Sequence, residues 1–327
     1  MLRFSGPFLF LGLVPVLYYA VGPAAPLLGI ALLLLALTGA ELVTGHGDAV
    51  IATQSPRGFR LLVLLYIPAQ IAVTAWAVWV SRQASAIGFW SLALSVGVTG
   101  GVFGMLAAHE AVHSRDPLET HLGNAMLTAM SYRHFRIAHI HGHHRWAGTQ
   151  RDSATARLGE SFYHFLPRTV AGQFREAWQF ERRRRGHRIA GDLAIMAALL
   201  AFVVAIAGPH ALLFFILQSV VAVTVLELFN YIAHYGLVRG RDAKGRLSRL
   251  DDRHSWNSSN VLANALIFNM GRHSSHHQKP AAPYQDLQMR PAPELPLGYA
   301  GSILLALAPP LWRRVMDPKA RLWARAA

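Results

Sequence analysis

Histidine is the residue type in this sequence whose number and spacing could do chemistry. The chain has 17 histidines, and most of them lie in three short clusters at 109–113, 139–144 and 273–277. Each cluster contains two histidines four residues apart, which lie on one face of a helix, so that both imidazoles can reach one metal ion. A further histidine, His234, follows a long apolar stretch. These positions indicate metal binding.

The number of clustered histidines indicates more than one metal ion. A metal ion in a protein takes about four to six ligands, and neutral imidazole suits iron, zinc and copper. Three clusters and one further histidine are too many for one ion and suit two. Six other histidines lack cluster spacing and are expected to be surface or core residues: His46, which lies outside the residues that the structure describes, His121, His164, His187, His210 and His254. His134 and His141 lie near the second cluster and are weaker ligand candidates.

The first cluster has an alternative interpretation. His109-Glu110-Ala111-Val112-His113 matches the H-E-x-x-H pattern of zinc peptidases, in which the glutamate acts as a base. An intramembrane protease would need one downstream ligand, and the other two clusters would have no role. A membrane metal binder or transporter is a second alternative. That class would place ionisable residues in mid-membrane, whereas the apolar segments here have almost none.

Long apolar segments must position the clusters. Hydrophobic residues make up 53% of the chain and charged residues 15%, against about 25% charged residues in soluble domains. A helix needs about 20 apolar residues to cross a bilayer. We therefore expect one all-α domain, 1–327, which is a six-helix integral membrane bundle with a cytoplasmic helical cap that carries the dinuclear site. The expected spans are 7–22, 24–43, 59–80, 86–108, 190–207 and 209–230, and the cap comprises 109–189 and 231–327.

Basic residues indicate the orientation, because positively charged loops stay in the cytoplasm. With six spans, both termini and all the histidine clusters lie on the side that holds every Lys and Arg except Arg82. We therefore expect a multi-pass protein of the bacterial inner membrane with its active site in the cytoplasm. The net charge of +14 then follows the membrane topology, and it does not indicate nucleic-acid binding. A cleaved signal peptide, suggested by Arg3 and the segment 22–25, would reverse this orientation.

The chain has no cysteine, which excludes disulfides, cysteine-ligated zinc and thiolate-held iron centres within it. It also lacks a G-x-G-x-x-G dinucleotide fingerprint, because the glycines at 97–104 have the wrong spacing and lie inside an apolar segment. We therefore expect no flavin or nucleotide in this chain. A redox enzyme of this kind would receive its electrons from another protein.

The clusters and their surroundings resemble the membrane alkane hydroxylases, or alkane 1-monooxygenases, within the wider membrane fatty-acid desaturase/hydroxylase group. Residues 132–144, YRHFRIAHIHGHH, are similar to the family's second histidine box. Residues 230–237, NYIAHYGL, resemble the NYxEHYGL signature that separates alkane hydroxylases from desaturases. RHSSHH at 272–277 is similar to the end of the last box, and PPLWRRVMDP at 309–318 to the C-terminal end.

This resemblance implies a di-iron monooxygenase that uses O2 to hydroxylate the terminal methyl of an alkane or similar aliphatic chain. It implies rubredoxin and its reductase as electron donors. A fatty-acid desaturase or hydroxylase, or an alkyl-aromatic methyl hydroxylase, is the alternative. The nine ligands of two non-haem irons that the resemblance implies are His109, His113, His139, His143, His144, His234, His273, His276 and His277.

Four positions depart from the family pattern. Ala138 and Ala233 replace glutamates that precede ligands, Gly271 replaces glutamine, and Ser275 replaces aspartate. Ligating histidines usually donate their second N–H to a carboxylate or carbonyl, and loss of that partner costs 10–100-fold in affinity or activity. We expect iron still to bind, because no ligand is lost, but in a more loosely tuned site. The remaining acids that could orient ligands are Glu110, Asp152, Glu160, Asp251 and Asp286.

Overall fold

The structure is a computed structural model that describes residues 2–43, 56–241 and 244–325. The elements in these ranges are helices, with two isolated β-bridges and no named strand, which confirms the all-α class. Backbone contacts divide the chain into two compact units. Unit 1 comprises 1–36, 53–136 and 181–226, and unit 2 comprises 37–52, 137–180 and 227–327. Each unit is described by itself, and a single integrated domain stays a prediction.

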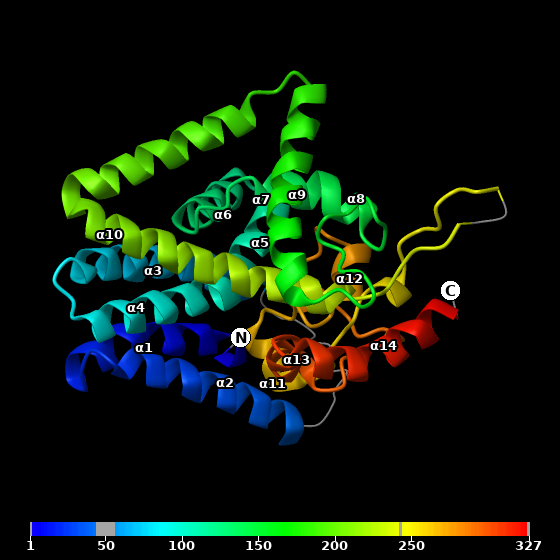
Figure 1. The fold of residues 1–327 in the computed structure, drawn as a ribbon, viewed down its shortest axis with the longest axis horizontal. Coiled ribbons are helices and arrows are strands. Elements are labelled where there is room, and N and C mark those ends of the chain that lie inside the picture. Colours follow the sequence, from blue (N-terminus) through cyan, green and yellow to red (C-terminus); the bar gives the residue numbers. More distant parts are fainter. Residues whose placement is uncertain (1, 44–55, 242–243, 326–327) are drawn as a thin grey trace. The chain divides into compact units, whose positions relative to one another are not determined.

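Unit 1 contains most of the apolar helices. Four stretches of the described residues are long and apolar enough to cross a membrane: Ala25–Val43, Arg57–Ser81, Ala86–His113 and Arg188–His234. The total of six spans stays a prediction. The helices, shown in Figure 1, are α1 (Gly6–Ala20), α2 (Ala25–Val43), α3 (Pro56–Ser81), α4 (Ala86–Thr99), the π-helical η2 (Gly100–Gly104), α5 (Met105–His113), α6 (Pro117–Ala129) and α10 (Arg188–His234). The C-terminal ends of α2 and α10 belong to unit 2.

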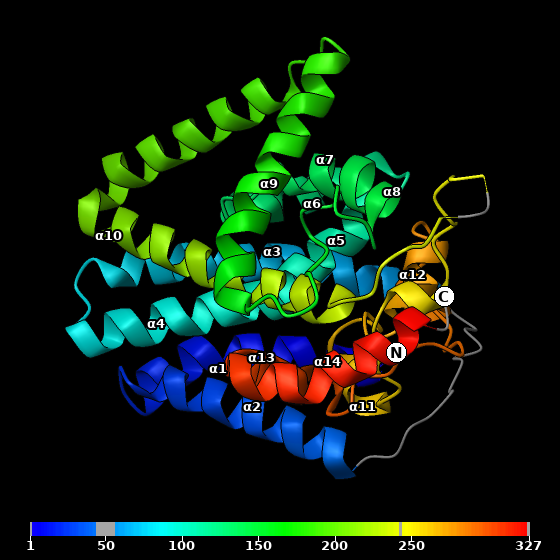
Figure 2. The ribbon, with the colours of Figure 1, turned by 45° about the vertical axis from the view of Figure 1, so that its right-hand side comes forward.

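The long helix α10 is broken near its middle, and Figures 1 and 2 both show the chain turning back there. Gly208 has φ 82° and ψ 174°, a conformation that only glycine adopts without a large steric penalty. Pro209 follows and can begin a helix, because the first turn does not need its missing N–H. This break coincides with the expected boundary between the apolar segments 190–207 and 209–230.

Glycines bring the helix 86–113 close to its neighbours. A Cβ on Gly97 would lie 2.5 Å from the Cβ of Val221, and one on Gly101 would lie 2.7 Å from the carbonyl oxygen of Ala222. Both contacts are to the second half of α10. Small residues allow such a close approach of helices in membranes. Gly97 and Gly101 therefore serve helix packing.

Helix α6 runs back along the apolar helix that precedes it, which the sequence did not indicate. Met130 lies against Gly100, Met126 against Gly104, and Gly123 against Ala108. The end of α6 is also bound to α10, because the Gln218 side chain donates a hydrogen bond to the carbonyl of Ala129 at 3.1 Å. Residues 126–130 thus lie beside the second half of the expected fourth span.

Unit 2 contains short helices and the C-terminal end of α10. Aromatic side chains fix that end: Tyr235 packs edge-on against Trp312, with ring centroids 5.2 Å apart, and donates a hydrogen bond to Asp317 at 2.6 Å. Trp256 donates to the Tyr235 carbonyl at 2.8 Å. The elements of unit 2 are η3 (Ala138–His143), α8 (His144–Trp146), α9 (Phe162–Arg183), η4 (Asp252–His254), α11 (Val261–Leu266), α12 (His273–Gln278), η5 (Tyr284–Asp286), α13 (Gly298–Ala306) and α14 (Pro309–Arg325). Helix α9 and the short α7 (Phe135–Ile137) are shared between the two units.

Candidate metal centre

Four buried histidines of unit 2 form one compact group, which we call the first histidine group. One ring nitrogen from each of them lies within 4.8 Å of those of the others. The members come from three separate segments of the chain: His143 from η3, His234 from the end of α10, and both His273 and His277 from α12. Four convergent imidazoles in a buried site provide the neutral nitrogen ligands that a divalent metal ion takes.

The nitrogen spacing in this group matches coordination to one ion. The Nε2 atom of His234 lies 3.0 Å from that of His273 and 3.0 Å from that of His277, and the last two are 3.1 Å apart. Two nitrogens at right angles around an ion with bonds of about 2.1 Å are about 3.0 Å apart, whereas tetrahedral angles separate them by about 3.4 Å. The triangle therefore fits one face of an octahedron.

Polar contacts orient the α12 and α10 ligands. The backbone N–H of Ser274 donates to Asn257 Oδ1 at 2.9 Å, which secures the first turn of α12. His234 Nδ1 lies 3.1 Å from the backbone carbonyl of His254, and an imidazole N–H can donate to that oxygen. His254 is in turn held by Asp251, whose carboxylate lies 2.9 Å from its Nδ1. Asp251 thus supports the orientation of His234 through a neighbouring backbone group.

His143 has a carboxylate behind its ring. Its Nδ1 lies 2.8 Å from Asp152 Oδ2, and Asp152 also accepts hydrogen bonds from the Thr155 hydroxyl at 2.6 Å and the Ala154 amide at 3.1 Å. Burial alone would raise the pKa of Asp152, but the adjacent His143 outweighs it, so the pKa lies below its usual value. His143 Nε2 is buried and has no hydrogen-bond partner among the described residues. Its lone pair is therefore available to a metal ion.

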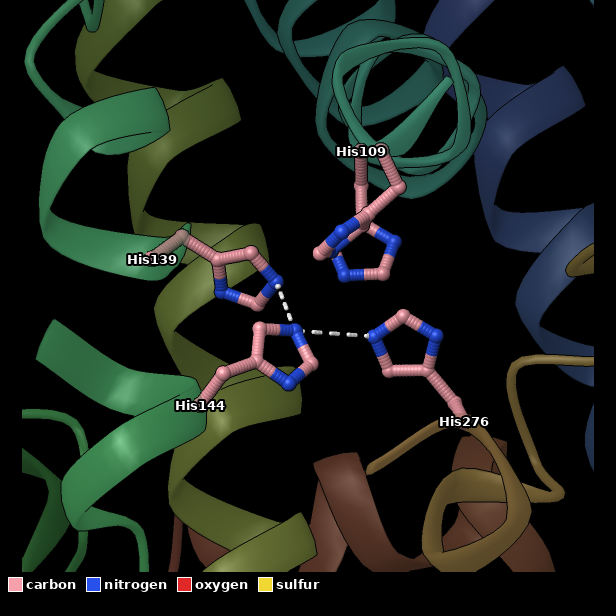
Figure 3. Close-up of side chains that lie close together, drawn as sticks. His109, His139, His144 and His276 are labelled. Atoms are coloured by element: carbon pink, nitrogen blue, oxygen red, sulfur yellow. Dashed lines mark hydrogen bonds between the residues drawn. The ribbon is translucent and has the colours of Figure 1, made fainter. Parts of the chain in front are cut away.

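Three more histidines of unit 2 form a second histidine group (Figure 3). His144 Nε2 lies 2.9 Å from His139 Nε2 and 3.2 Å from His276 Nε2. His139 and His144 are five residues apart, and the segment between them is π-helical. A π-helix bonds residue i to residue i+5, so that these two positions lie on one face. The expected pairing of His139 with His143 is wrong for this reason.

The last two predicted ligands lie on α5 in unit 1. His109 and His113 have ring centroids 4.9 Å apart, as their i, i+4 spacing predicts, and His109 is buried. The two weaker histidine candidates have other neighbours. His141 stacks on Phe180, with centroids 4.2 Å apart, and His134 packs edge-on against Tyr132. Burial lowers the pKa of His134 to about 4, which keeps it neutral.

The acids proposed to orient ligands fall into different environments. Asp152 contacts a predicted ligand directly, and Asp251 acts through His254. Glu160 is instead bound by Arg168, with contacts of 2.7 and 2.8 Å. Glu110 is half-buried on α5, and Asp286 is exposed.

The four departures from the family pattern are all buried. Ala138 and Ala233 are 2% and 1% exposed, and the Ser275 hydroxyl accepts a hydrogen bond from the Gln288 amide at 3.0 Å. A side chain at Gly271 would collide with the Asn264 amide oxygen. This glycine therefore fits its present neighbour, and a glutamine there would require Asn264 to move.

Sequence reasoning missed two acids near the first histidine group. Glu176 accepts a hydrogen bond from the Ser153 amide at 3.0 Å, directly beside Asp152, and a Cβ at position 142 would lie 2.9 Å from its carboxylate. Gly142, which lies within the HGHH run, was the one residue in the sequence that could have indicated this close contact with Glu176. Glu227 is fully buried and accepts hydrogen bonds from the side chains of Thr169 and Gln173 at 3.0 and 2.9 Å. No motif marked it.

Comparisons with known proteins identify the family of the chain. The fatty acid desaturase family model matches residues 84–292. Alkane 1-monooxygenase 1 of Pseudomonas aeruginosa is 39% identical over 280 residues, covering 81% of this chain and 73% of the relative. Alkane 1-monooxygenase of Pseudomonas putida is 35% identical and covers 97% of this chain and 79% of the relative. The xylene/toluene monooxygenase hydroxylase component XylM of Pseudomonas putida is 31% identical and covers 70% of this chain and 64% of that protein.

The range that the family model matches contains all the histidines of both groups, and the relatives confirm the resemblance seen in the motifs. They make the chain an alkane 1-monooxygenase-like oxygenase with apolar membrane helices and buried histidine clusters. The chain belongs to the alkane 1-monooxygenase family, within the fatty acid desaturase family.

Proposed function

We propose that this protein hydroxylates the terminal methyl of an alkane or similar aliphatic chain to a primary alcohol, using O2 and a pair of non-haem irons. The observation that carries the proposal is the presence of two adjacent groups of convergent histidines in unit 2. The first group would hold one iron. The second group, together with His109 and His113 as the family resemblance implies, would hold the other.

The metal identity is supported by the family, because the chain belongs to the alkane 1-monooxygenase family and the resemblance implies two irons. The three Nε2 atoms of His234, His273 and His277 are 3.0–3.1 Å apart, close enough to bind one ion together. Two groups of histidines also exceed the ligands that the single zinc of a peptidase needs. Iron would supply the activation of O2 that an unactivated C–H bond requires.

The protein's own contribution is to orient the ligands and exclude water. Asp152 fixes the ring of His143, and the carbonyl of His254 fixes that of His234. We propose six membrane spans with both termini and the metal centre on the cytoplasmic side. An apolar substrate would then arrive from the lipid, and electrons would arrive from rubredoxin in the cytoplasm.

The experiment is product analysis by mass spectrometry. The protein is purified without chelator, reconstituted with a rubredoxin and its reductase, and offered alkanes, fatty acids and alkyl-aromatic compounds under O2. We expect a primary alcohol from an alkane in the wild type and none in His143→Ala. The likeness to a xylene/toluene monooxygenase component favours alkyl-aromatic methyl hydroxylation as the second candidate. Products from alkyl-aromatics alone would overturn the alkane assignment, and one zinc per chain without iron would support the peptidase interpretation.

A further inference from the structure

Unit 1 contains a large apolar cavity that the proposed reaction does not use. Its volume is about 730 Å³, and it lies between α3, α6 and α10. Apolar side chains form most of its surface, among them Val78 and Trp79 of α3 and Leu199, Phe202 and Ile206 of α10. A cavity of this size is large enough for a long hydrocarbon chain.

None of the nine predicted histidine ligands is among the described residues that line this cavity. His121 does line it, but His121 lies outside both histidine groups. Of the expected spans 24–43, 59–80 and 86–108, only the second contributes to its wall. The cavity can therefore hold an occupant other than the substrate.

One end of the cavity is basic. Arg133 lines it and is anchored by Asp192, whose Oδ1 lies 2.6 Å from Arg133 Nε, and by the Thr128 hydroxyl at 2.8 Å. Arg136 and Arg188 are not among the described lining residues, but they lie close to Arg133 and Asp192 in charge interaction: burial first, and then the charge of Arg188, lower the pKa of Arg136. Asp192 offsets one of these three positive charges. The surplus positive charge marks this end as a site for an anion.

The length of the apolar surface fits one leaflet of a membrane. In the first half of α10, before the break at Gly208, the lining residues extend from Ile195 to Ala207, which is about 18 Å at 1.5 Å per residue. Half of the hydrocarbon core of a bilayer is about 15 Å thick. The basic end adjoins the first turn of α10, where Arg188 is exposed. A lipid of the leaflet on that side would meet the charges with its headgroup and the cavity with its chain.

We propose that this cavity binds one anionic phospholipid, whose phosphate lies at Arg133, Arg136 and Arg188 and whose acyl chain fills the space between α3, α6 and α10. Guanidinium groups recognise phosphate through paired hydrogen bonds, and basic residues at the membrane surface attract anionic lipids. The proposal is independent of the reaction assigned to the histidines. The lipid would brace the first half of α10 against α3 and α6.

The test compares lipid retention in native mass spectrometry after reconstitution in nanodiscs of phosphatidylglycerol and phosphatidylcholine. Leu199→Trp fills the cavity, and Leu193→Trp is the matched control on an exposed face of the same helix. We expect the wild type and the control to retain one phosphatidylglycerol per chain, and Leu199→Trp to retain none. Iron content equal to that of the wild type would show that each variant is folded.

Headgroup recognition is tested separately with Arg136→Gln/Arg188→Gln, which leaves the structural contacts of Arg133 intact. We expect its preference for phosphatidylglycerol over phosphatidylcholine to fall about tenfold or more, whereas Arg182→Gln/Arg183→Gln should keep that preference. Equal retention of both lipids by the wild type, or retention by Leu199→Trp, would overturn the proposal. A third outcome would also overturn the proposal and assign the cavity to the substrate. In that outcome hexadecane displaces the lipid, and Leu199→Trp loses alkane turnover whereas Leu193→Trp keeps it.

Discussion

His143 and Asp152 form a buried pair in which imidazole Nδ1 lies 2.8 Å from a carboxylate oxygen, with side chains 3% and 0% exposed. The carboxylate cannot turn away, because Thr155 and the Ala154 amide also donate to it. An Nδ1–H bonded to a fixed carboxylate leaves Nε2 as the free lone pair and sets the plane of the ring. Asp152 is therefore placed to orient the ring of His143, a predicted metal ligand.

Replacing Asp152 with asparagine should weaken the metal site. Asparagine keeps the shape but removes the charge that favours the required tautomer of His143, so iron affinity or turnover should fall 10–100-fold. Iron content measured at a series of ferrous iron concentrations, together with alcohol formation, checks this. Asp286→Asn, the same change at an exposed aspartate, should leave both unchanged. Unaltered iron affinity in Asp152→Asn would mean that the pair has no part in metal binding.

The two histidine groups should lose their irons separately. His277→Ala removes a ligand from the first group and His139→Ala from the second, so each variant should retain about one of two irons while losing turnover. Elemental analysis of protein purified without chelator measures the ratio. His187→Ala and His210→Ala, outside both groups, should keep two. A complete loss of iron in both variants would show that the two groups bind metal as one cooperative unit.

The hydrogen-bonded ion pair of Glu160 and Arg168 should make the free energy of unfolding depend on pH. Burial alone would raise the pKa of Glu160, but the hydrogen bonds from Arg168 outweigh it and lower the pKa. Stability from this pair is therefore fully present above the unfolded-state pKa of about 4.3, and it is lost as pH falls through the lower folded-state pKa. Glu160→Gln should lower the free energy of unfolding by about 1–3 kcal/mol at neutral pH. Its melting temperature, measured in detergent, should also fall less steeply at acidic pH than that of the wild type. The same pH dependence in both proteins would contradict this.

The convergence of the histidine clusters and the apolar helices could be predicted from the sequence, because both depend on local patterns. Clustered histidines and runs of apolar residues need no tertiary information. The break at Gly208-Pro209 was likewise visible, since glycine and proline fix the backbone locally.

The grouping of the histidines could not be predicted in the same way. The π-helical turn at 138–143 pairs His139 with His144 and leaves His143 to the other group. Nothing in the residues 138–144 distinguishes a π-helix from an α-helix. The buried Glu227 was missed for a related reason: its partners Thr169 and Gln173 are more than fifty residues away.

Electron delivery should weaken as salt is added. The chain carries a net charge of +14, and Arg182–Arg185 lie exposed, so a basic face should attract an acidic rubredoxin. Exposed charges are screened over about 8 Å at physiological ionic strength, so the rate of reduction by rubredoxin should fall as salt increases. Stopped-flow reduction at several sodium chloride concentrations measures this. A small neutral chemical reductant is the control, and a rubredoxin rate indifferent to ionic strength would exclude electrostatic docking.

Restoring the usual acids should show what their absence does. Ala138, Ala233 and Ser275 stand where the family usually has carboxylates, and all three are buried. We expect the wild type to consume more O2 and reductant than it forms alcohol, and to release peroxide. The triple variant Ala138→Glu, Ala233→Glu and Ser275→Asp should raise the ratio of alcohol formed to O2 consumed. Gly271 is left unchanged, because a side chain there would collide with Asn264.

The matched control for this restoration is Ala138→Gln, Ala233→Gln and Ser275→Asn, which adds similar volume without charge. Improved coupling in the acidic variant alone would show that carboxylates tune the site. A fall in melting temperature without improved coupling would mean that the new carboxylates are buried without partners, and that the small residues serve a different substrate. A wild-type ratio near one with an alkane would sink the idea of loose tuning. Activity only on another apolar compound would sink the alkane assignment and leave the oxygenase intact.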